Sequence, residues 1–216
     1  MKKIMILISG NGSNLQAILQ AHQSKRWPAQ IVGVISNRPK ALGIGIAQAF
    51  QIPVKVLDHT QFADRADFDQ ALFESVQALE PDLIILAGFM RILANDFVRF
   101  YAGRLINIHP SLLPSFPGLH THTKALETGV KWHGATVHFV TQEMDVGPII
   151  VQGIVPVHPD DTSITLAKRV AQIEHQIYPQ AVEWFILKRL HLEDGKVRVD
   201  SEQSVHLNLP VKTQND

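Results

Sequence analysis

The sequence predicts an α/β fold: a Rossmann-like, open and mostly parallel sheet with helices on both faces, extended by antiparallel strands in its C-terminal half. Short, continuous apolar runs such as Ile4–Ser9 and Leu83–Ala87 are typical of strands buried on both faces, and they alternate with segments of helical periodicity. Beyond Ala135, two β-rich segments follow one another with only a loop between them. At 216 residues, the chain is long enough for one domain with a sizeable core.

The first half alternates strands and helices. Each expected strand is a short, mainly branched apolar run, and they lie at Ile4–Ser9, Ile31–Ser36, Val54–Leu57, Leu83–Ala87 and Leu105–Ile108. The helices between them are expected at Asn14–His22, Ala41–Phe50, Phe62–Leu79 and Ala94–Tyr101. In the first of these, Leu15, Ile18 and Leu19 have the spacing of one helix face, and Pro81 closes the third helix.

The second half begins with Ala135–Thr141 and Ile149–Val157, two strands expected to pair antiparallel and extend the sheet. Asp161 and Thr162 then cap a long helix, which has an apolar stripe at Leu166, Val170, Ile173 and Ile177. Pro179 is expected to kink or end this helix, although residues 182–187 look helical again. From 191 to 216 the sequence is polar and weakly patterned, which predicts a partly flexible C-terminal extension.

Composition excludes several classes of function. Lys and Arg number 20, as do Asp and Glu, so the positive excess of a nucleic-acid or acidic-membrane surface is missing. Without cysteine there is no disulfide framework, no thiolate nucleophile and no Cys-ligated metal. The first apolar run stops at Ser9, too soon for a signal peptide, and no run approaches the length of a membrane span. A soluble, cytoplasmic protein is expected.

A glycine-rich turn, Gly10–Asn14, joins the first strand to the first helix. Such a turn presents backbone N–H groups and the positive end of the helix dipole to an anion, and Ser13 and Asn14 add side-chain donors. The alternative is a plain tight turn in which Ser13 or Asn14 caps the helix. Because Leu15 replaces the third glycine of a dinucleotide motif and no Gly-Lys-Ser/Thr follows, a monophosphate fits best.

Asn107 and His109 stand two residues apart at the end of the fifth strand, so both side chains point to the same side. An amide donor beside an imidazole suits the stabilisation of an oxyanion and the movement of a proton, although histidines in such pairs are often structural. Asp145 is either a turn former or, if the fold brings it to His109, the carboxylate that holds the imidazole. No Ser or Cys nucleophile is evident, which favours direct transfer between two bound substrates.

Histidines give no support for a metal site. His120 and His122 are two residues apart, but neither His133 nor His138 completes a recognisable zinc spacing. We therefore expect no metal.

Longer motifs identify a family. Ile8–Gln16, Leu86–Leu93, Asn107–Pro114, Pro117–His122, His133–Val140 and Asp145–Pro148 resemble the phosphoribosylglycinamide formyltransferases of the folate-dependent formyltransferase superfamily. The resemblance runs from Lys3 to about Leu190. It implies the formyltransferase fold in a single domain over 1–190, with a ribonucleotide-phosphate half (1–104) and a catalytic and folate-binding half (105–190).

This resemblance implies that the chain transfers the formyl group of 10-formyltetrahydrofolate, a co-substrate, to the amine of glycinamide ribonucleotide in de novo purine (IMP) synthesis. It assigns catalysis to Asn107, His109 and Asp145. It assigns ribonucleotide binding to Gly12, Ser13, Asn14, Gly88, Gln172 and Glu174. It assigns folate binding to Arg65, Met90, Arg91, Ile92, Leu93, Asn107, Val140, Thr141, Gln142, Glu143, Met144 and Asp145. An ordinary solvated helix charge is the alternative for Arg65.

The sequence departs from the family pattern at two positions. At Ala171 a polar side chain near the ribose is frequent, so that hydrogen bond is expected to be absent or replaced by one from Gln172, and at Thr123 Arg is common. Alternative functions are formyltetrahydrofolate hydrolysis or other folate-dependent formyl transfer, and a non-catalytic nucleotide-binding module. The hydrolase family carries an N-terminal regulatory domain, and methionyl-tRNA formyltransferase a basic RNA-binding domain. We expect small-molecule substrates, no nucleic acid, no membrane, and a monomer or homodimer.

Overall fold

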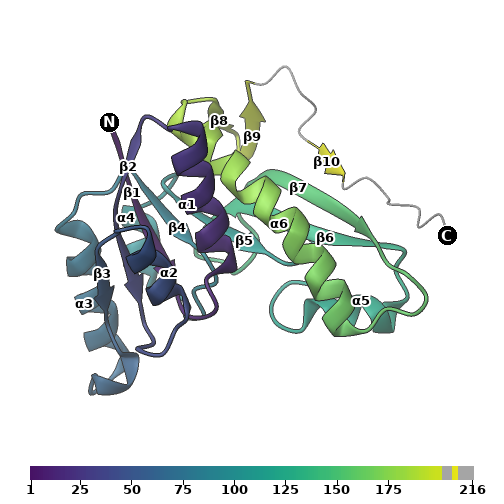
Figure 1. Cartoon of the computed structure of the whole chain (residues 1–216), viewed down its shortest axis with the longest axis horizontal. Coiled ribbons are helices and arrows are strands. Elements are labelled where there is room, and N and C mark those ends of the chain that lie inside the picture. The colour runs from purple at the N-terminus through teal and green to yellow at the C-terminus, as the bar shows by residue number, and fades with distance from the viewer. Residues whose placement is uncertain (201–205, 209–216) are drawn as a thin grey trace.

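The computed structural model describes residues 1–200 and 206–208, and its main feature is an eight-stranded sheet (Figure 1). The strand order is β3-β2-β1-β4-β5-β6-β7-β10. The strands are β1 (Lys2–Ile8), β2 (Ala29–Ser36), β3 (Val54–Val56), β4 (Leu83–Leu86), β5 (Leu105–His109), β6 (Trp132–Phe139), β7 (Ile149–Pro156) and β10 (His206–Asn208). Only the β5–β6 and β6–β7 pairs are antiparallel among these. The predicted fold class is confirmed.

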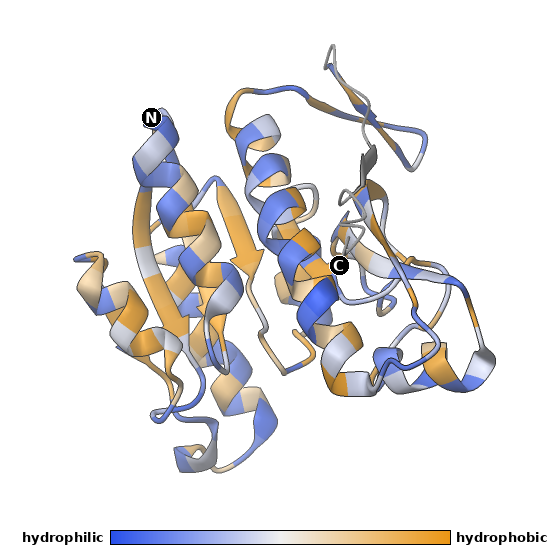
Figure 2. Ribbon diagram, turned by 45° about the vertical axis from the view of Figure 1, so that its right-hand side comes forward, coloured by the Kyte–Doolittle hydropathy of each residue, from blue (hydrophilic) through white to orange (hydrophobic). Residues whose placement is uncertain are grey.

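Helices cover both faces of the sheet because each central strand buries both of its sides. In β1, Ile4, Ile6 and Ile8 join the core under one set of helices, whereas Met5 and Leu7 join the core of the opposite face. The first set is α1 (Ser13–Lys25), α2 (Gly43–Ala49), α5 (Thr121–Thr128) and α6 (Ser163–Ile186), and the second is α3 (Arg65–Gln77) and α4 (Asn95–Phe100), with a 3₁₀ turn at His59–Gln61. Figure 2 shows the strands of the sheet mostly in the hydrophobic colour and mixed colours on the helices.

The long helix α6 starts at a capping box, in which Thr162 and Thr165 each bond the backbone N–H of the other. Pro179 was expected to kink or end this helix. It does not end it, because α6 continues through it to Ile186. Proline removes one backbone hydrogen bond, and Pro179 lies on the buried side of a helix whose apolar stripe packs on the sheet. The packing of this apolar stripe on the sheet therefore outweighs the loss of one backbone hydrogen bond.

The sequence did not predict the 3₁₀ turn, α5, the hairpin of β8 (Leu190–Glu193) with β9 (Lys196–Val199), or β10. The hairpin turns at Asp194-Gly195, both with positive φ, the dipeptide that a two-residue turn of this kind prefers. It occupies the start of the C-terminal extension for which flexibility was predicted; residues 201–205 and 209–216 of that extension lie outside the described residues. No helix within the described chain is both long and apolar enough to cross a membrane.

Candidate functional site

His109 and Asp145 meet at the carboxyl end of β5. His109 is the last residue of β5, and Asp145 belongs to the loop between β6 and β7. The antiparallel pairing of β5 with β6 brings this loop back, so that Nδ1 of His109 lies 3.4 Å from Oδ2 of Asp145. Their side chains are only 7% and 9% exposed. The sequence alone could not show that these two residues are neighbours, because their contact depends on how the fold pairs β5 with β6.

The remaining polar atoms of this pair are held by the backbone of the loop that follows β5. Nε2 of His109 lies 2.9 Å from the carbonyl oxygen of Phe116, and the N–H of Gly118 donates to Oδ2 of Asp145 at 2.9 Å. Thr136 lies opposite His109 on β6, and its hydroxyl bonds Ser111 and Leu113 in the same loop. Both members of the pair are therefore fixed in orientation.

The Asp145 loop is itself tightly constrained. Asp145 has a φ of 59°, a left-handed conformation that Asp tolerates better than most residues. Two residues later, a Cβ added to Gly147 would lie 1.8 Å from the carbonyl oxygen of Phe139, so only glycine fits there. These backbone features return the carboxylate to the end of β5.

His138 is a polar neighbour of the site that the sequence reasoning did not assign to it. Its Nε2 lies 3.4 Å from Nδ2 of Asn107 and 4.0 Å from Oδ1 of Asp145, and the residue is 2% exposed. Burial lowers the pKa of His138, against the opposing effects of its bond to the Phe139 carbonyl and of the Asp145 charge. The only sequence signal for His138 is its position on the strand that pairs with β5.

The glycine-rich turn lies at the amino end of α1. Gly12 has a φ of 78°, and a Cβ there would come within 2.6 Å of Cα of Gly43 in α2, so the turn requires glycine. Gly12 is also the N-cap residue, and no side chain caps the helix. This excludes the alternative in which Ser13 or Asn14 is the cap, and leaves the first N–H groups of α1 for another acceptor.

Asn14 faces α6 instead. Its Nδ2 donates to Oε2 of Glu174 at 2.8 Å, which links α1 to α6. Its Oδ1 is buried and has no hydrogen-bond partner among the described residues. Burial raises the pKa of Glu174, and the bond from Asn14 acts in the opposite direction. Gln172 is exposed and, at about 100° per residue, lies about 200° round the helix from Glu174, so the two side chains point to different sides.

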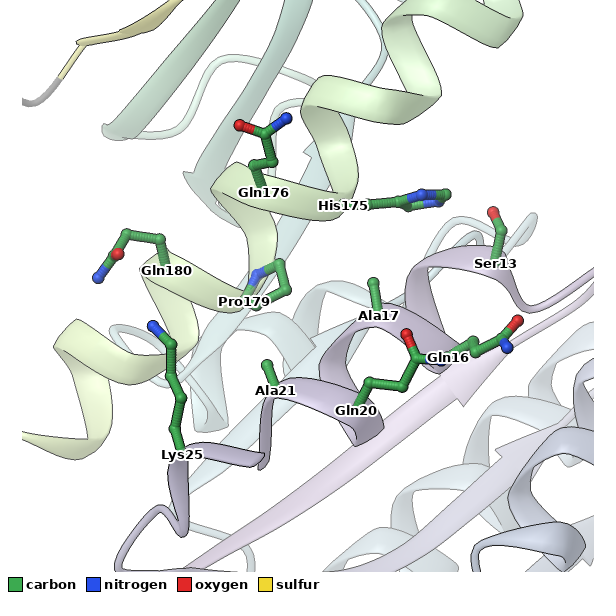
Figure 3. Close-up of a pocket in the computed structure, with 10 residues that line it drawn as sticks. All are labelled: Ser13, Gln16, Ala17, Gln20, Ala21, Lys25, His175, Gln176, Pro179 and Gln180. Carbon is green, nitrogen blue, oxygen red and sulfur yellow. The ribbon is translucent and has the colours of Figure 1, made fainter. Parts of the chain in front are cut away.

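A groove of about 460 Å³ lies between α1 and α6. Figure 3 shows the residues that line it. Ser13 and His175 line its end nearest the glycine-rich turn, and Nε2 of His175 is buried with no hydrogen-bond partner in the part of the chain that the structure describes. His175, like His138, was not singled out from the sequence. Its signal is the helical spacing that puts it on the side of α6 facing α1.

A second loop relevant to the site follows β4. Gly88 adopts a φ of 76°, the N–H of Met90 donates to the hydroxyl of Ser9 at 2.8 Å, and Met90 itself is exposed. Arg65 donates to the carbonyl oxygen of Ile92 at 2.9 Å. Arg65 is nevertheless exposed and also pairs with Asp69 on α3, so it joins α3 to this loop while it stays in contact with solvent.

The side chains of the loop after β4 differ in their exposure to solvent. Ile92 is exposed, whereas Leu93 is buried in the core beneath α3 and α4. The guanidinium of Arg91 lies over the Phe68 ring, 4.7 Å from its centroid. Leu93 consequently has only main-chain groups to offer a ligand.

The segment after β6 holds the other residues expected on the folate side. Val140 is half-buried against the same core as Leu93, and the following residues, Thr141, Gln142, Glu143 and Met144, are exposed. Among the histidines considered for metal binding, Nε2 of His133 lies 3.2 Å from Nδ1 of His122. The described residues contain no group of three His, Cys, Asp or Glu side chains arranged to hold a metal ion.

Comparisons with known proteins agree on the family of this chain. The model of the formyl transferase family matches residues 2–182. The chain is 45% identical to phosphoribosylglycinamide formyltransferase of Escherichia coli, covering 93% of this chain and 94% of the relative. It is 44% identical to the Homo sapiens trifunctional purine biosynthetic protein adenosine-3 over 90% of this chain, which is 19% of that relative.

Solved structures agree. Glycinamide ribonucleotide transformylase 1 from Symbiobacterium toebii superposes with a TM-score of 0.89 at 45% identity, covering 92% of this chain and 94% of that one. A formyltetrahydrofolate deformylase from Pseudomonas syringae is more distant, with a TM-score of 0.85 at 30% identity, covering 92% of this chain but 65% of its own.

Proposed function

Because this chain belongs to the formyl transferase family, we propose that the side chains at the carboxyl end of β5 carry out its formyl transfer. The reaction moves the formyl group of 10-formyltetrahydrofolate to the amine of N1-(5-phospho-D-ribosyl)glycinamide, giving the N-formyl product and tetrahydrofolate in purine biosynthesis. The contact between His109 and Asp145, at 3.4 Å in a buried setting, is the observation that carries the catalytic assignment.

The ribonucleotide binds at the amino end of α1. The uncapped N–H groups that follow Gly12, with the side chain of Ser13, hold the 5′-phosphate at the positive end of the helix. Glu174, held by Asn14, accepts hydrogen bonds from the ribose, and Gly88 completes the ribonucleotide site. The role expected for Gln172 has no support, because its side chain points to a different side of α6 from Glu174. Ala171 offers no polar contact there.

The folate co-substrate binds on the other side of His109. Main-chain groups of Met90, Arg91, Ile92 and Leu93, and of the segment from Val140 to Asp145, hold the pterin. Exposed apolar side chains at Met90, Ile92 and Met144 cover its ring. Arg65, at the edge of this loop, keeps a positive charge near the folate carboxylates while one of its nitrogens bonds Ile92.

The chemistry is direct transfer. The amine attacks the formyl carbon, a C–N bond forms, and the carbonyl electron pair moves onto oxygen. His109 and the amide of Asn107 donate hydrogen bonds to this oxyanion, and the Asp145 carboxylate stabilises the charged imidazole. The proton of the attacking nitrogen passes through water to the folate nitrogen, whose bond to carbon then breaks.

Further proposals concern the whole chain. Residues 1–190 form one formyltransferase domain, with the phosphate-binding half over 1–104 and the catalytic half over 105–190. The protein works on small molecules in the cytoplasm, as a monomer or homodimer.

Folate release measured with and without the ribonucleotide tests the acceptor. Tetrahydrofolate is expected to appear only when glycinamide ribonucleotide is present, with one formylated product per folate released. Release at the same rate without the amine would assign the chain to formyltetrahydrofolate hydrolysis instead. A His109→Ala variant serves as the blank, because it keeps both binding loops and lacks the imidazole.

A further inference from the structure

Strand pairing places His138 directly opposite Asn107. The antiparallel register of β5 and β6 matches Asn107 with His138, and side chains of such cross-strand partners lie on the same face of the sheet. Nδ2 of Asn107 and Nε2 of His138 are 3.4 Å apart, and within the described part of the chain the Asn107 amide has no other side-chain hydrogen bond. The contact is thus set by the sheet rather than by a mobile loop.

The surroundings of His138 define its protonation. Its Nδ1 lies 2.9 Å from the carbonyl oxygen of Phe139, and a carbonyl can only accept, so Nδ1 carries a proton. Burial lowers the pKa of His138, which keeps the ring neutral. Nε2 therefore has a free lone pair and can only accept a hydrogen bond.

A lone pair at this position decides which way the Asn107 amide turns. If the amide were flipped, its oxygen would face the Nε2 lone pair, and two acceptors would stand 3.4 Å apart. We propose that His138 is a positioning residue: it takes one N–H of Asn107 and leaves the second N–H for the oxyanion of the tetrahedral intermediate. This inference rests on the proposed role of Asn107 as an oxyanion donor.

Two substitutions separate orientation from packing. His138→Leu fills the site but has no acceptor, so kcat is expected to fall about 10- to 100-fold, part of the usual loss for an oxyanion donor, with both KM values within about threefold. His138→Gln can place its carbonyl oxygen near the position of Nε2. Its kcat is expected to lie closer to the wild-type value than to that of His138→Leu on a logarithmic scale. Val155→Ala, which removes buried volume from β7, is the control: lower stability with unchanged kcat.

The same substitution in an Asn107→Ala background gives the decisive comparison. With no amide left to orient, His138→Leu is expected to lower kcat by less than about threefold. Equal losses in the two backgrounds, or no loss in the single variant, would overturn the proposal.

A measurement without substrate keeps this inference distinct from the proposed function. In the ¹⁵N-labelled protein at neutral pH, NMR of the imidazole nitrogens is expected to show His138 protonated at Nδ1 and bare at Nε2, with His138→Gln identifying the signal. A proton on Nε2 would refute the positioning role. A wild-type enzyme that fails to formylate the amine would refute the proposed function, and leave this tautomer unchanged.

Discussion

The carbonyl oxygen of Phe116 lies 2.9 Å from Nε2 of His109, at the other ring nitrogen from the one that faces Asp145. Both neighbours of the ring are acceptors, so a doubly protonated imidazole satisfies both at once. The contact from Nδ1 to Asp145 is the longer of the two, so in the proposed mechanism Nδ1–H is the donor that an oxyanion can share with Asp145. In the proposed mechanism, the backbone of the loop after β5 therefore favours Nδ1 as the nitrogen that acts.

Removal of either member of this pair is expected to abolish most turnover without unfolding the protein. His109→Ala and Asp145→Ala should each lower kcat by about 10²-fold or more, since an oxyanion donor or its charge partner is lost. Steady-state kinetics and thermal melts check this. His191→Ala, a histidine in the β8–β9 hairpin, is the matched control, and full activity in either site variant would contradict the assignment.

Asn14→Asp is expected to raise KM for the ribonucleotide about tenfold or more, and to leave KM for the folate nearly unchanged. The new carboxylate would stand beside the proposed phosphate site and against the half-buried Glu174, to which Asn14 now donates at 2.8 Å. Initial rates at varied ribonucleotide concentration measure the effect. Gln20→Glu adds the same charge farther along α1, and an equal rise in KM there would argue against a local role for Asn14.

Acid is expected to destabilise the fold through His133. Burial, with the neighbouring His122 and His109 charges, lowers the pKa of His133 to about 4 from an ordinary 6.5. Between these values the unfolded chain binds more protons, so the free energy of unfolding falls as pH falls through this window, by up to about 3 kcal/mol.

Urea unfolding from about pH 7 to about pH 5 tests this slope. His133→Gln should flatten it, although His122 and His138 titrate in the same direction. His120→Gln, at an exposed position, should leave it as in the wild type. A slope equally steep in His133→Gln would exclude His133 as the cause.

Asp161 is expected to stabilise the start of α6. It accepts bonds from both terminal nitrogens of Arg169, at 2.6 and 2.8 Å, and from the N–H of His158. Asp161→Asn should cost about 1–3 kcal/mol, because these charge-assisted bonds are weakened within a mostly buried site.

The pH dependence of this effect follows from the same contacts. The bond from Arg169 holds the pKa of Asp161 well below its ordinary value, so the contribution is present above that ordinary value and is lost as pH falls further. Thermal melts of Asp161→Asn against the exposed Asp160→Asn measure the difference. Equal melting temperatures for the two variants would refute this role.

Sequence patterns predicted what depends on local chemistry. Continuous apolar runs gave the parallel strands, and the spacing of Asn107 and His109 gave two side chains on one face of β5. The identity of the residue that lies opposite Asn107 on the neighbouring strand has no such local signal, so the sequence did not indicate His138. The turn at Asp194-Gly195 did carry a signal, but the polar strands around it hid the hairpin. Pro179 shows the opposite case, in which burial overrides a strong local preference.

The hydrogen bond between Asn14 and Glu174 has a consequence for how the protein is made. One partner leaves the ribosome among the first residues of the chain, and the other follows only after most of the sheet has been translated. The proposed ribonucleotide site is thus incomplete through most of synthesis, and we expect a nascent chain to bind the phosphorylated substrate only once α6 has emerged and settled beside α1.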